Sequence, residues 1–277
     1  MRKTIASLMF AALLITATAA FAAPLDTFKG QKGTLDISGG TAHIPVMKEA
    51  AKRIMTTNPD IRITVAGGGS GVGVKQVGEG LVTIGNTGRP LKEDEIKKYG
   101  LVTYPFAIDG VAVVVNPKNK INSLTTQQVM DIYSGKIKDW KEVGGAKGAI
   151  NIFGREDGSG TREVFTDRAI KKGELVSSVN VVNSNGAMKT AVAQDKRAIG
   201  YVGIGHIDNS VKAPTFDGVV PSQENAANGT FKVTRNLFMN TKGKAEGITK
   251  LFIDYIFSPE GAEIIKDSGY IPLPAGN

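Results

Sequence analysis

The sequence predicts an α/β fold, and three observations support this prediction. Short runs rich in β-branched residues alternate with stretches whose apolar residues recur at helical spacing. Three of the predicted strands end in loops of glycine, serine and threonine that lead directly into a predicted helix. Beyond an apolar N-terminal segment the chain has roughly 255 residues, enough for one large domain or two medium ones. The residues alone therefore favour α/β architecture with two possible lobes and no fixed boundary between them.

In the first half of the chain, apolar spacing and chain breakers delimit each element. Residues 42–57 repeat apolar side chains every three or four positions, and Asn58-Pro59 ends this predicted helix. Residues 111–115 are apolar throughout, which indicates a buried strand, and Asn116-Pro117 ends it. The predicted strands lie at 34–38, 61–66, 81–84 and 111–115, and the predicted helices at 42–57, 72–77 and 93–98.

The second half alternates in the same way. A polar, turn-rich segment at 218–229 separates it from a strand and two final helices. The predicted strands lie at 150–153, 179–182, 199–202 and 231–239, and the predicted helices at 125–134, 159–171, 187–193, 248–257 and 259–266.

The N-terminus has the pattern of a cleaved secretory signal peptide at residues 1–22. Arg2 and Lys3 precede an apolar run, and Ala20-Phe21-Ala22 offers small residues around a cleavage site. The alternative is an uncleaved membrane anchor, for which the run is short. The chain has no cysteine, which excludes a lipid-bearing cysteine, disulfides and cysteine metal sites. We therefore expect a free, soluble periplasmic protein.

The charge balance favours anionic partners. Removing the two charges of Arg2 and Lys3 from the net charge of +8 leaves +6 on the mature chain. Secretion argues against nucleic acid, and the lysines are interspersed with acids. Residues 92–98, for example, read as a solvated helix face.

The three glycine loops, at 38–41, 67–71 and 155–161, suit an anion site. A helix start exposes backbone N–H groups at the positive end of the helix dipole. Glycine allows close approach, serine and threonine add hydroxyls, and Arg155 adds a planar fork for two oxygens of one anion. The alternative is plain helix capping. Because the carboxyl ends of strands in an open α/β sheet face one crevice, the loops could converge on one ligand.

Other chemistry is not indicated by motif. No loop fits the dinucleotide, P-loop or G-x-S-x-G patterns. The two histidines, His43 and His206, lack the spacing of a zinc site, and no cysteine accompanies them. His43 reads as a packing or surface residue, whereas a Ser159–His206 hydrolase dyad stays open as an alternative.

At these loops the chain resembles the periplasmic phosphate-binding proteins of ABC importers. The resemblance runs in order over nearly the whole mature chain, and R-x-D-G-S-G-T at 155–161 is its most specific stretch. The other matching stretches lie at 38–41, 69–76, 84–91, 109–117, 199–202 and 258–261.

The resemblance implies a two-lobe, type II-like periplasmic solute-binding protein fold, with the ligand in a cleft between lobes joined by two crossing strands. The crossings are expected near residues 113–116 and 233–239. The first lobe is then discontinuous, formed by residues 23–114 plus 231–277, and the second lobe spans 115–230.

The resemblance also implies the ligand-binding residues, with no cofactor and no metal. Asp157 is expected to orient Arg155 from behind without touching the ligand. The expected phosphate-binding residues are Thr41, Ala42 (through its amide), Ser70, Gly71, Arg89, Arg155, Ser159, Gly160 and Thr161.

One position departs from the family pattern. Many members carry an aspartate after the third strand, where it accepts the proton of monohydrogen phosphate, but this chain has Gly88 followed by Arg89. A carboxylate only accepts hydrogen bonds and would repel unprotonated sulfate, so its loss weakens the case for phosphate specificity. Asn86 or Thr87 are the neutral residues that could supply an acceptor instead.

We therefore expect a monomeric, non-enzymatic binding protein that captures inorganic phosphate and delivers it to the membrane permease of an ABC importer. The alternatives are a binding protein for sulfate or arsenate and a secreted phosphatase. A phosphatase needs a metal cluster or an activated nucleophile, and neither is visible in the sequence.

Overall fold

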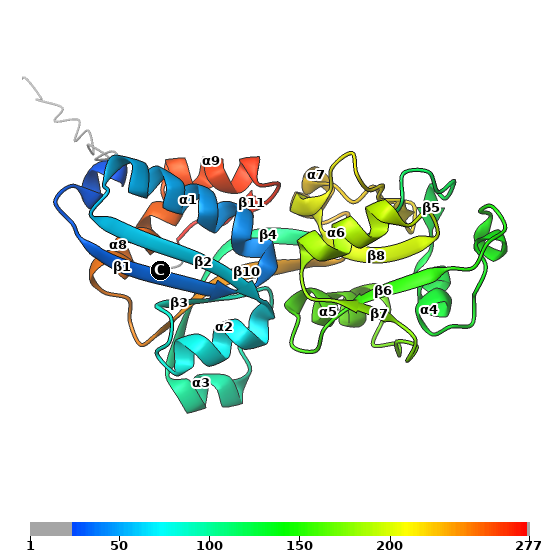
Figure 1. Cartoon of the computed structure of the whole chain (residues 1–277), viewed down its shortest axis with the longest axis horizontal. Coiled ribbons are helices and arrows are strands. Elements are labelled where there is room, and N and C mark those ends of the chain that lie inside the picture. The colour runs from blue at the N-terminus through cyan, green and yellow to red at the C-terminus, as the bar shows by residue number, and fades with distance from the viewer. Residues whose placement is uncertain (1–23, 276–277) are drawn as a thin grey trace, which may run out of the picture.

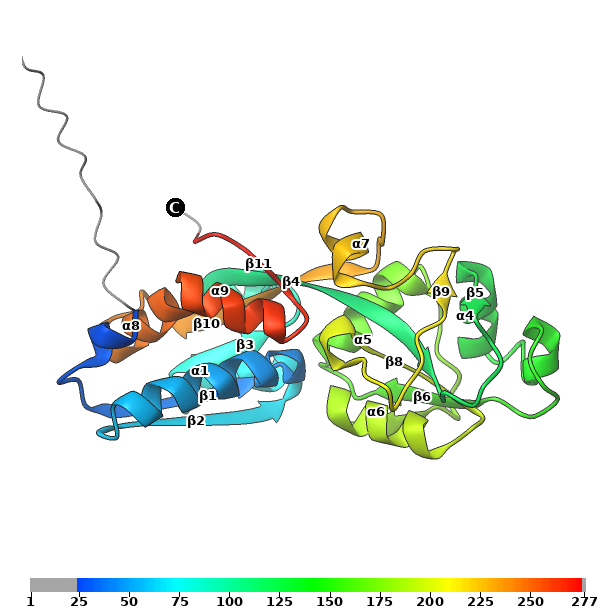
Figure 2. The same cartoon turned by 90° about the horizontal axis from the view of Figure 1, so that it is seen from above.

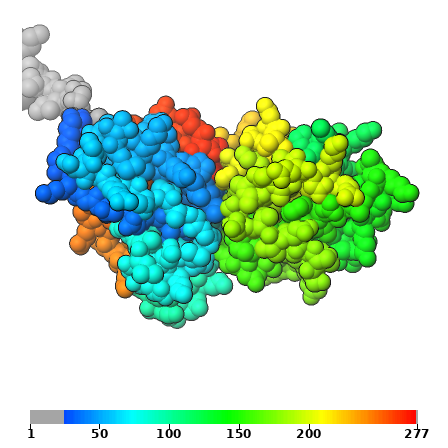
Figure 3. All heavy atoms as spheres, in the orientation of Figure 1, coloured from blue at the N-terminus to red at the C-terminus, as the bar shows by residue number. Residues whose placement is uncertain are grey.

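The computed structural model describes residues 24–275, so the predicted signal peptide at 1–22 lies outside the described residues. Figures 1 and 2 show two α/β lobes that lie end to end, with two extended segments passing between them. On the face shown in Figure 3 the lobes are in contact. The predicted two-lobe α/β architecture is confirmed. In the described part of the chain, no helix combines the length and the apolar character needed to cross a membrane.

The strands lie close to the predicted positions, with several additions. They are β1 (Gly33–Gly39), β2 (Ile61–Gly68), β3 (Ile84–Thr87), β4 (Leu101–Val115), β5 (Ser123–Leu124), β6 (Asn151–Arg155), β7 (Asn180–Val182), β8 (Ala198–Gly203), β9 (Thr215–Phe216), β10 (Thr234–Lys242) and β11 (Ile271–Pro272).

The helices fill the intervals between strands. The α-helices are α1 (Ile44–Thr57), α2 (Gly69–Gly78), α3 (Glu93–Tyr99), α4 (Thr126–Tyr133), α5 (Gly160–Val164), α6 (Asn185–Gln194), α7 (Gln223–Ala227), α8 (Gly247–Ile256) and α9 (Pro259–Asp267). A 3₁₀ turn, η2 (Thr41–His43), leads into α1, and a π-helical turn, η4 (Phe165–Ala169), extends α5.

One path of paired strands runs through both lobes in the order β2-β1-β3-β10-β4-β8-β6-β7. β1 is parallel to β2 and β3, whereas β10 is antiparallel to β3 and β4. The long strand β4 belongs to both lobes, because residues 101–110 pair with β10 and residues 111–115 pair with β8. The first lobe, as used below, contains β1–β3, β10 and residues 101–110, and the second lobe contains β5–β9 and residues 111–115.

The change of partner within β4 falls between Gly110 and Val111, a little earlier than the expected crossing at 113–116. A Cβ atom at Gly110 would lie 2.2 Å from Ile204 Cδ1, so a glycine is needed where the strand passes between the lobes. The chain returns beside this point, where Val111 donates its N–H to the carbonyl of Val233 just before β10 begins. The lobe boundaries at 114/115 and 230/231 remain predictions.

Each lobe packs helices on both faces of its part of the sheet (Figure 1). In the first lobe α1, α8 and α9 share one hydrophobic core, while α2 contributes to a separate, smaller cluster. In the second lobe the apolar run of β4 alternates between two cores. Val113 and Val115 face one of them, and Val114 faces the core that includes Met188 and Val192 of α6. This explains why residues 111–115 are apolar throughout.

The third predicted strand, at 81–84, is displaced in the structure to β3. The N–H groups of Leu81 and Val82 both donate to the carbonyl of Gln76 and so complete the end of α2. Leu81 is accordingly 65% exposed despite its apolar side chain. The predicted loop at 218–229 contains α7, whose first turn is capped by the hydroxyl of Ser222.

Three glycines let α2 lie directly on the backbone of the sheet. Cβ atoms at Gly39 and Gly73 would lie 2.4 Å and 2.5 Å from the carbonyl oxygen of Asn86. A Cβ atom at Gly85 would lie 2.3 Å from the carbonyl oxygen of Gly73. Because these neighbours are backbone atoms, a side chain at any of these positions has to move the helix. The glycines therefore fix where α2, and the Ser70 at its first turn, stand above the sheet.

We predict that Gly73→Ala destabilises the protein by about 1–3 kcal/mol, because the added methyl group overpacks the contact between α2 and β3. The matched control is Gly186→Ala in α6, where the nearest atom lies 3.9 Å away. There alanine should raise the free energy of unfolding by up to about 1 kcal/mol through helix propensity. Urea unfolding of both variants measures the difference, and equal free energies of unfolding would contradict the packing argument.

Candidate functional site

The three glycine loops converge between the lobes on a small, partly open cavity of about 190 Å³, open solvent at its mouth included. β1 delivers the first loop to η2, β2 delivers the second to α2, and β6 of the second lobe delivers the third to α5. A strand of the first lobe, β10, contributes an arginine as well. The lining residues are Gly40, Thr41, Ala42, His43, Gly69, Ser70, Gly88, Ser159, Gly160, Thr161 and Arg235.

The two hydroxyls that the first lobe supplies are oriented by hydrogen bonds that they accept. The Oγ of Ser70 accepts from the backbone N–H of Gly88 at 3.0 Å. The Oγ1 of Thr41 accepts from the backbone N–H and from the side-chain Nδ2 of Asn185, at 3.3 and 3.0 Å. Asn185 belongs to α6 of the second lobe, so the Thr41 contact also bridges the lobes. Neither hydroxyl caps its own helix, contrary to the simple capping alternative.

The second lobe supplies two further hydroxyls, and each of them also accepts a hydrogen bond from the protein. The Oγ of Ser159 accepts from the N–H of Arg162 at 3.2 Å, so this serine does cap α5. The Oγ1 of Thr161 accepts from the Nη1 of Arg235 at 3.0 Å. A hydroxyl has one proton to donate and lone pairs with which to accept. With a lone pair of each hydroxyl engaged by the protein, the four O–H protons can be donated to a bound anion.

Arg155 is the last residue of β6, four residues before Ser159, and it is not among the residues that line the cavity. It is only 1% exposed, and Glu156 holds its guanidinium at Nε and Nη2 with distances of 2.9 and 2.8 Å. The Nε also donates to the carbonyl of Val182. Its Nη1 is buried and has no hydrogen-bond partner among residues 24–275. An unsatisfied charged donor in the interior is costly, and the oxygen of an anion would satisfy it.

The expected support of Arg155 by Asp157 is wrong. The side chain of Asp157 is 95% exposed and pairs at 2.7 Å with Arg162. Glu156 supports Arg155 instead. The chain turns at Gly158, whose φ is +79°, so Asp157 stands on the outer side of the loop.

Two other predicted ligands, Gly71 and Arg89, do not line the cavity and contact the opposite lobe instead. Gly71 donates its N–H to the carbonyl of Gly158 at 3.1 Å. Arg89 forms a bidentate pair with Glu95, and its Nε lies 3.2 Å from Glu163 of α5. Arg89 is therefore a bridge between lobes that stands in a second, larger cleft.

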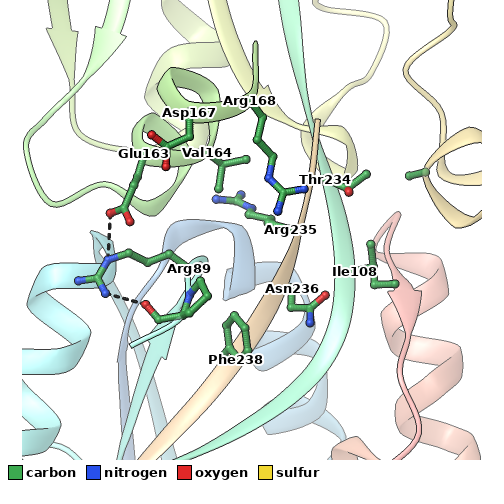
Figure 4. A pocket seen from close by; sticks show the side chains of 12 residues that line it. Arg89, Ile108, Glu163, Val164, Asp167, Arg168, Thr234, Arg235, Asn236 and Phe238 are labelled. Carbon is green, nitrogen blue, oxygen red and sulfur yellow. Dashed lines mark hydrogen bonds and ion pairs between the residues drawn. The ribbon is translucent and has the colours of Figure 1, made fainter. Parts of the chain in front are cut away.

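Figure 4 shows this larger cleft, which α5, η4 and the crossing strands β4 and β10 enclose. Its volume is about 820 Å³, open solvent at its mouth included. Arg168 points into it from η4, and Arg235 lies on its floor. Arg235 therefore stands between the two cavities and lines both of them.

Arg235 is a charged site residue that the sequence interpretation missed. Its Nε and Nη2 donate to one oxygen of Asp109, at 3.0 and 2.7 Å, and both residues are buried. The signal was present in the strand predicted at 231–239. Apolar residues alternate at Phe231, Val233, Leu237 and Met239, and Arg235 occupies the buried phase of that alternation. A charged residue at a core position of a strand needs a buried partner or a ligand.

The two histidines lie near this arginine and are neutral at physiological pH. Burial lowers the pKa of His43 to about 3, with the charge of Arg235 adding to the effect. Burial also lowers the pKa of His206 to about 4. His43 lines the cavity and is fully buried, contrary to a surface position. His206 is not a lining residue, and Ser159 uses its hydroxyl to cap α5, so this geometry gives no support to a Ser159–His206 dyad.

The two lobes, the crossing strands and the polar cavity between the lobes define a two-lobe solute-binding protein. A family model described as the PBP superfamily domain matches residues 27–260. The phosphate-binding protein PstS of Bacillus subtilis is 38% identical over 254 residues, which cover 90% of this chain and 84% of that protein. The PstS of Pseudomonas aeruginosa is 29% identical, with 99% and 96% covered.

Solved structures agree with these relatives. An ABC transporter substrate-binding protein from Clostridium perfringens, solved with bound phosphate, superimposes with a TM-score of 0.83 at 37% identity. The match covers 87% of this chain and all of that one. An ABC-type phosphate transport receptor from Vibrio cholerae gives a TM-score of 0.70 at 34% identity, with 87% and 100% covered. The chain belongs to the PBP superfamily and, within it, to the family of the PstS phosphate-binding proteins.

We predict that Tyr201→Phe destabilises the protein by about 1–3 kcal/mol. The phenol oxygen of Tyr201 accepts the backbone N–H of Arg155 at 2.9 Å, and its removal leaves that buried N–H unsatisfied. The ring stacks on Phe165 with centroids 3.9 Å apart, a contact that phenylalanine retains. Urea unfolding measures the change. An unaltered midpoint would show that the hydroxyl does not position Arg155.

Proposed function

We propose that this protein captures inorganic phosphate in the cavity between its lobes and delivers it to the permease of an ABC importer. The observation that carries the proposal is the polar cavity between the lobes, where four hydroxyls from both lobes keep their protons free for an anion. The turn η2 and the first turns of α2 and α5 add backbone N–H groups, with the positive ends of α2 and α5 directed to the cavity. Membership of the PstS family supports phosphate as that anion.

In this proposal the ligands of phosphate are the predicted residues that line the cavity, joined by the buried Nη1 of Arg155. A guanidinium nitrogen that no protein group satisfies is a strong partner for a phosphate oxygen. Gly71 and Arg89 stabilise the contact between the lobes instead of touching the anion. The proposed lining ligands are Thr41, Ala42, Ser70, Ser159, Gly160 and Thr161.

The proposal places the mature protein in the periplasm as a free monomer, after removal of the signal peptide at 1–22. Its macromolecular partner is the permease, and nucleic acid has no part. Curated relatives are named as binding proteins, which favours binding over the phosphatase alternative.

Calorimetry tests the proposal on protein stripped of bound anion by unfolding and refolding. We predict tight binding of phosphate, and a loss of about 10- to 100-fold in affinity for Arg155→Lys. The reason is that one hydrogen bond to a charged group is worth about 1.5–3 kcal/mol and lysine lacks the fork. Arg62→Gln, an exposed arginine on β2, is the control with matched charge loss.

If the unmodified protein bound phosphate at none of the pH values tested, the proposed function would be refuted. Wild-type affinity in Arg155→Lys would remove only Arg155 from the list of ligands. Turnover of a chromogenic phosphate ester would instead establish an enzyme.

We also predict that phosphate closes the lobes of a monomer. Residues on opposite lobes meet at the cavity, as in the contacts of Thr41 with Asn185 and of Arg235 with Thr161, so a ligand held by both lobes favours the closed state. Small-angle scattering should show a smaller radius of gyration with phosphate. The melting temperature should rise with phosphate concentration. Identical scattering curves with and without phosphate would argue against closure.

A further inference from the structure

The guanidinium of Arg235 is fixed with one edge toward the anion cavity. Asp109 takes the Nε and Nη2 groups, so the opposite nitrogen, Nη1, is left to face Thr161 and the cavity wall. Nη1 carries two N–H groups, and Thr161 accepts from this nitrogen. A second N–H therefore remains for a ligand.

Gly88 provides the space that this guanidinium occupies. A Cβ atom at Gly88 would lie 2.7 Å from the Nη1 of Arg235 and 3.1 Å from its Cζ. Any side chain at position 88 would thus displace the arginine. The cavity wall at this point is a cation, where the sequence interpretation expected neutral groups around Asn86 and Thr87. Neither of those two residues lines the cavity.

The remaining lining side chains carry hydrogen-bond donors or apolar atoms, apart from the neutral ring of His43, whose Nδ1 lies 3.1 Å from the carbonyl oxygen of Gly40. Each of the four hydroxyls already accepts a hydrogen bond from the protein. No aspartate or glutamate is among the residues that line the cavity in the described part of the chain. Among the described residues, such a site has no lining carboxylate that requires a proton on the ligand, and its buried positive charge stabilises each negative charge of a bound anion.

Building on the proposed function, we propose that Arg235 is a specificity-determining residue that makes the site recognise the two negative charges of a tetrahedral anion, not its proton. The dianion of phosphate then binds and the dihydrogen monoanion binds poorly. Sulfate, which is a dianion without a proton, competes measurably.

Phosphate itself is the titrating partner in the tested range. Above pH ~5 both His43 and His206 are neutral, since burial lowers the pKa values of these histidines to about 3 and about 4. Burial raises the pKa of Asp109, and Arg235 opposes that shift. Protonation of Asp109 would leave the charge of Arg235 unpaired and strengthen anion binding at low pH. The proposal predicts the opposite change, namely that phosphate binds more weakly at low pH. The other charged or titratable groups around Arg235 are Arg89, Arg155, Glu163, Asp167, Arg168 and Tyr270.

The first experiment is calorimetry of the unmodified protein with phosphate and with sulfate, between pH ~5.5 and ~8.5, a range that spans the second ionisation of phosphate. Because sulfate keeps its charge throughout, its binding reports changes in the protein alone. We expect phosphate affinity to fall roughly tenfold per pH unit below that ionisation, since one proton must leave the ligand. Sulfate affinity should stay flat.

The second experiment assigns the effect to Arg235. Arg235→Gln should lower the affinity for both anions at least tenfold at pH ~8, because a buried charge-assisted donor is lost. The double variant Arg235→Gln with Asp109→Asn avoids a buried unpaired carboxylate and serves if the single variant fails to fold. Arg62→Gln is again the charge-matched control.

The variant Gly88→Asp places a carboxylate against the Nη1 of Arg235. It should weaken the binding of sulfate more than the binding of phosphate, because sulfate has no proton to donate to the carboxylate.

Each outcome decides something different. Phosphate affinity that does not change with pH, or no sulfate binding at millimolar concentration, overturns recognition by charge while leaving the proposed function standing. Wild-type affinity and pH dependence in the Arg235 variants overturn the role of Arg235. A protein that binds phosphate at no pH fails the proposed function instead.

Discussion

The buried ion pair between Asp109 and Arg235 connects the parts of the molecule that act together. Asp109 lies near the end of the first-lobe portion of β4, and Arg235 lies opposite it near the start of β10, so the pair joins the two strands where they cross between the lobes. Arg235 also reaches Thr161 of the second lobe. Burying two charges costs desolvation energy, which a close pair only partly returns. The pair is therefore better explained by its positioning of the Arg235 guanidinium, which it holds with one edge at the cavity, than by a contribution to stability.

Glycines, which have no side chain, determine the size of the cavity as much as the side chains that line it. A Cβ atom at Gly160 would lie 2.4 Å from the hydroxyl of Ser70 and 3.1 Å from the carbonyl carbon of Gly88. The second lobe thus approaches the first backbone to backbone at the cavity wall. In the first lobe, Gly73 and Gly85 bring α2 down onto the sheet and so place Ser70. The abundance of glycine in the loops reflects these contacts as well as the turns themselves.

The sequence predicted the fold class, most of the elements and the meeting of the three glycine loops, because hydrophobic period and chain breakers are local signals. The strand at 101–110 was missed because Pro105, Asp109 and Gly110 interrupt its apolar pattern. The family resemblance implied Asp157 as the support of Arg155, whereas Glu156 takes that place, since only the geometry of the turn decides which carboxylate faces Arg155. Arg235 could be suspected from the strand pattern, but its partner lies 126 residues away and pairing at that separation is not readable from one sequence.

The surface between the lobes is polar, and this makes the closed arrangement reversible. The contacts that cross it are hydrogen bonds and ion pairs, such as that between Arg89 and Glu163, whereas the separate hydrophobic cores stay within each lobe. Exchange of such contacts for water changes the free energy little, because a partly exposed ion pair is worth at most about 1 kcal/mol. Buried charges without a full set of partners, such as the Nη1 of Arg155, disfavour closure in the absence of an anion. Closure is then favourable when the ligand supplies the missing acceptors, so binding and lobe movement are one equilibrium.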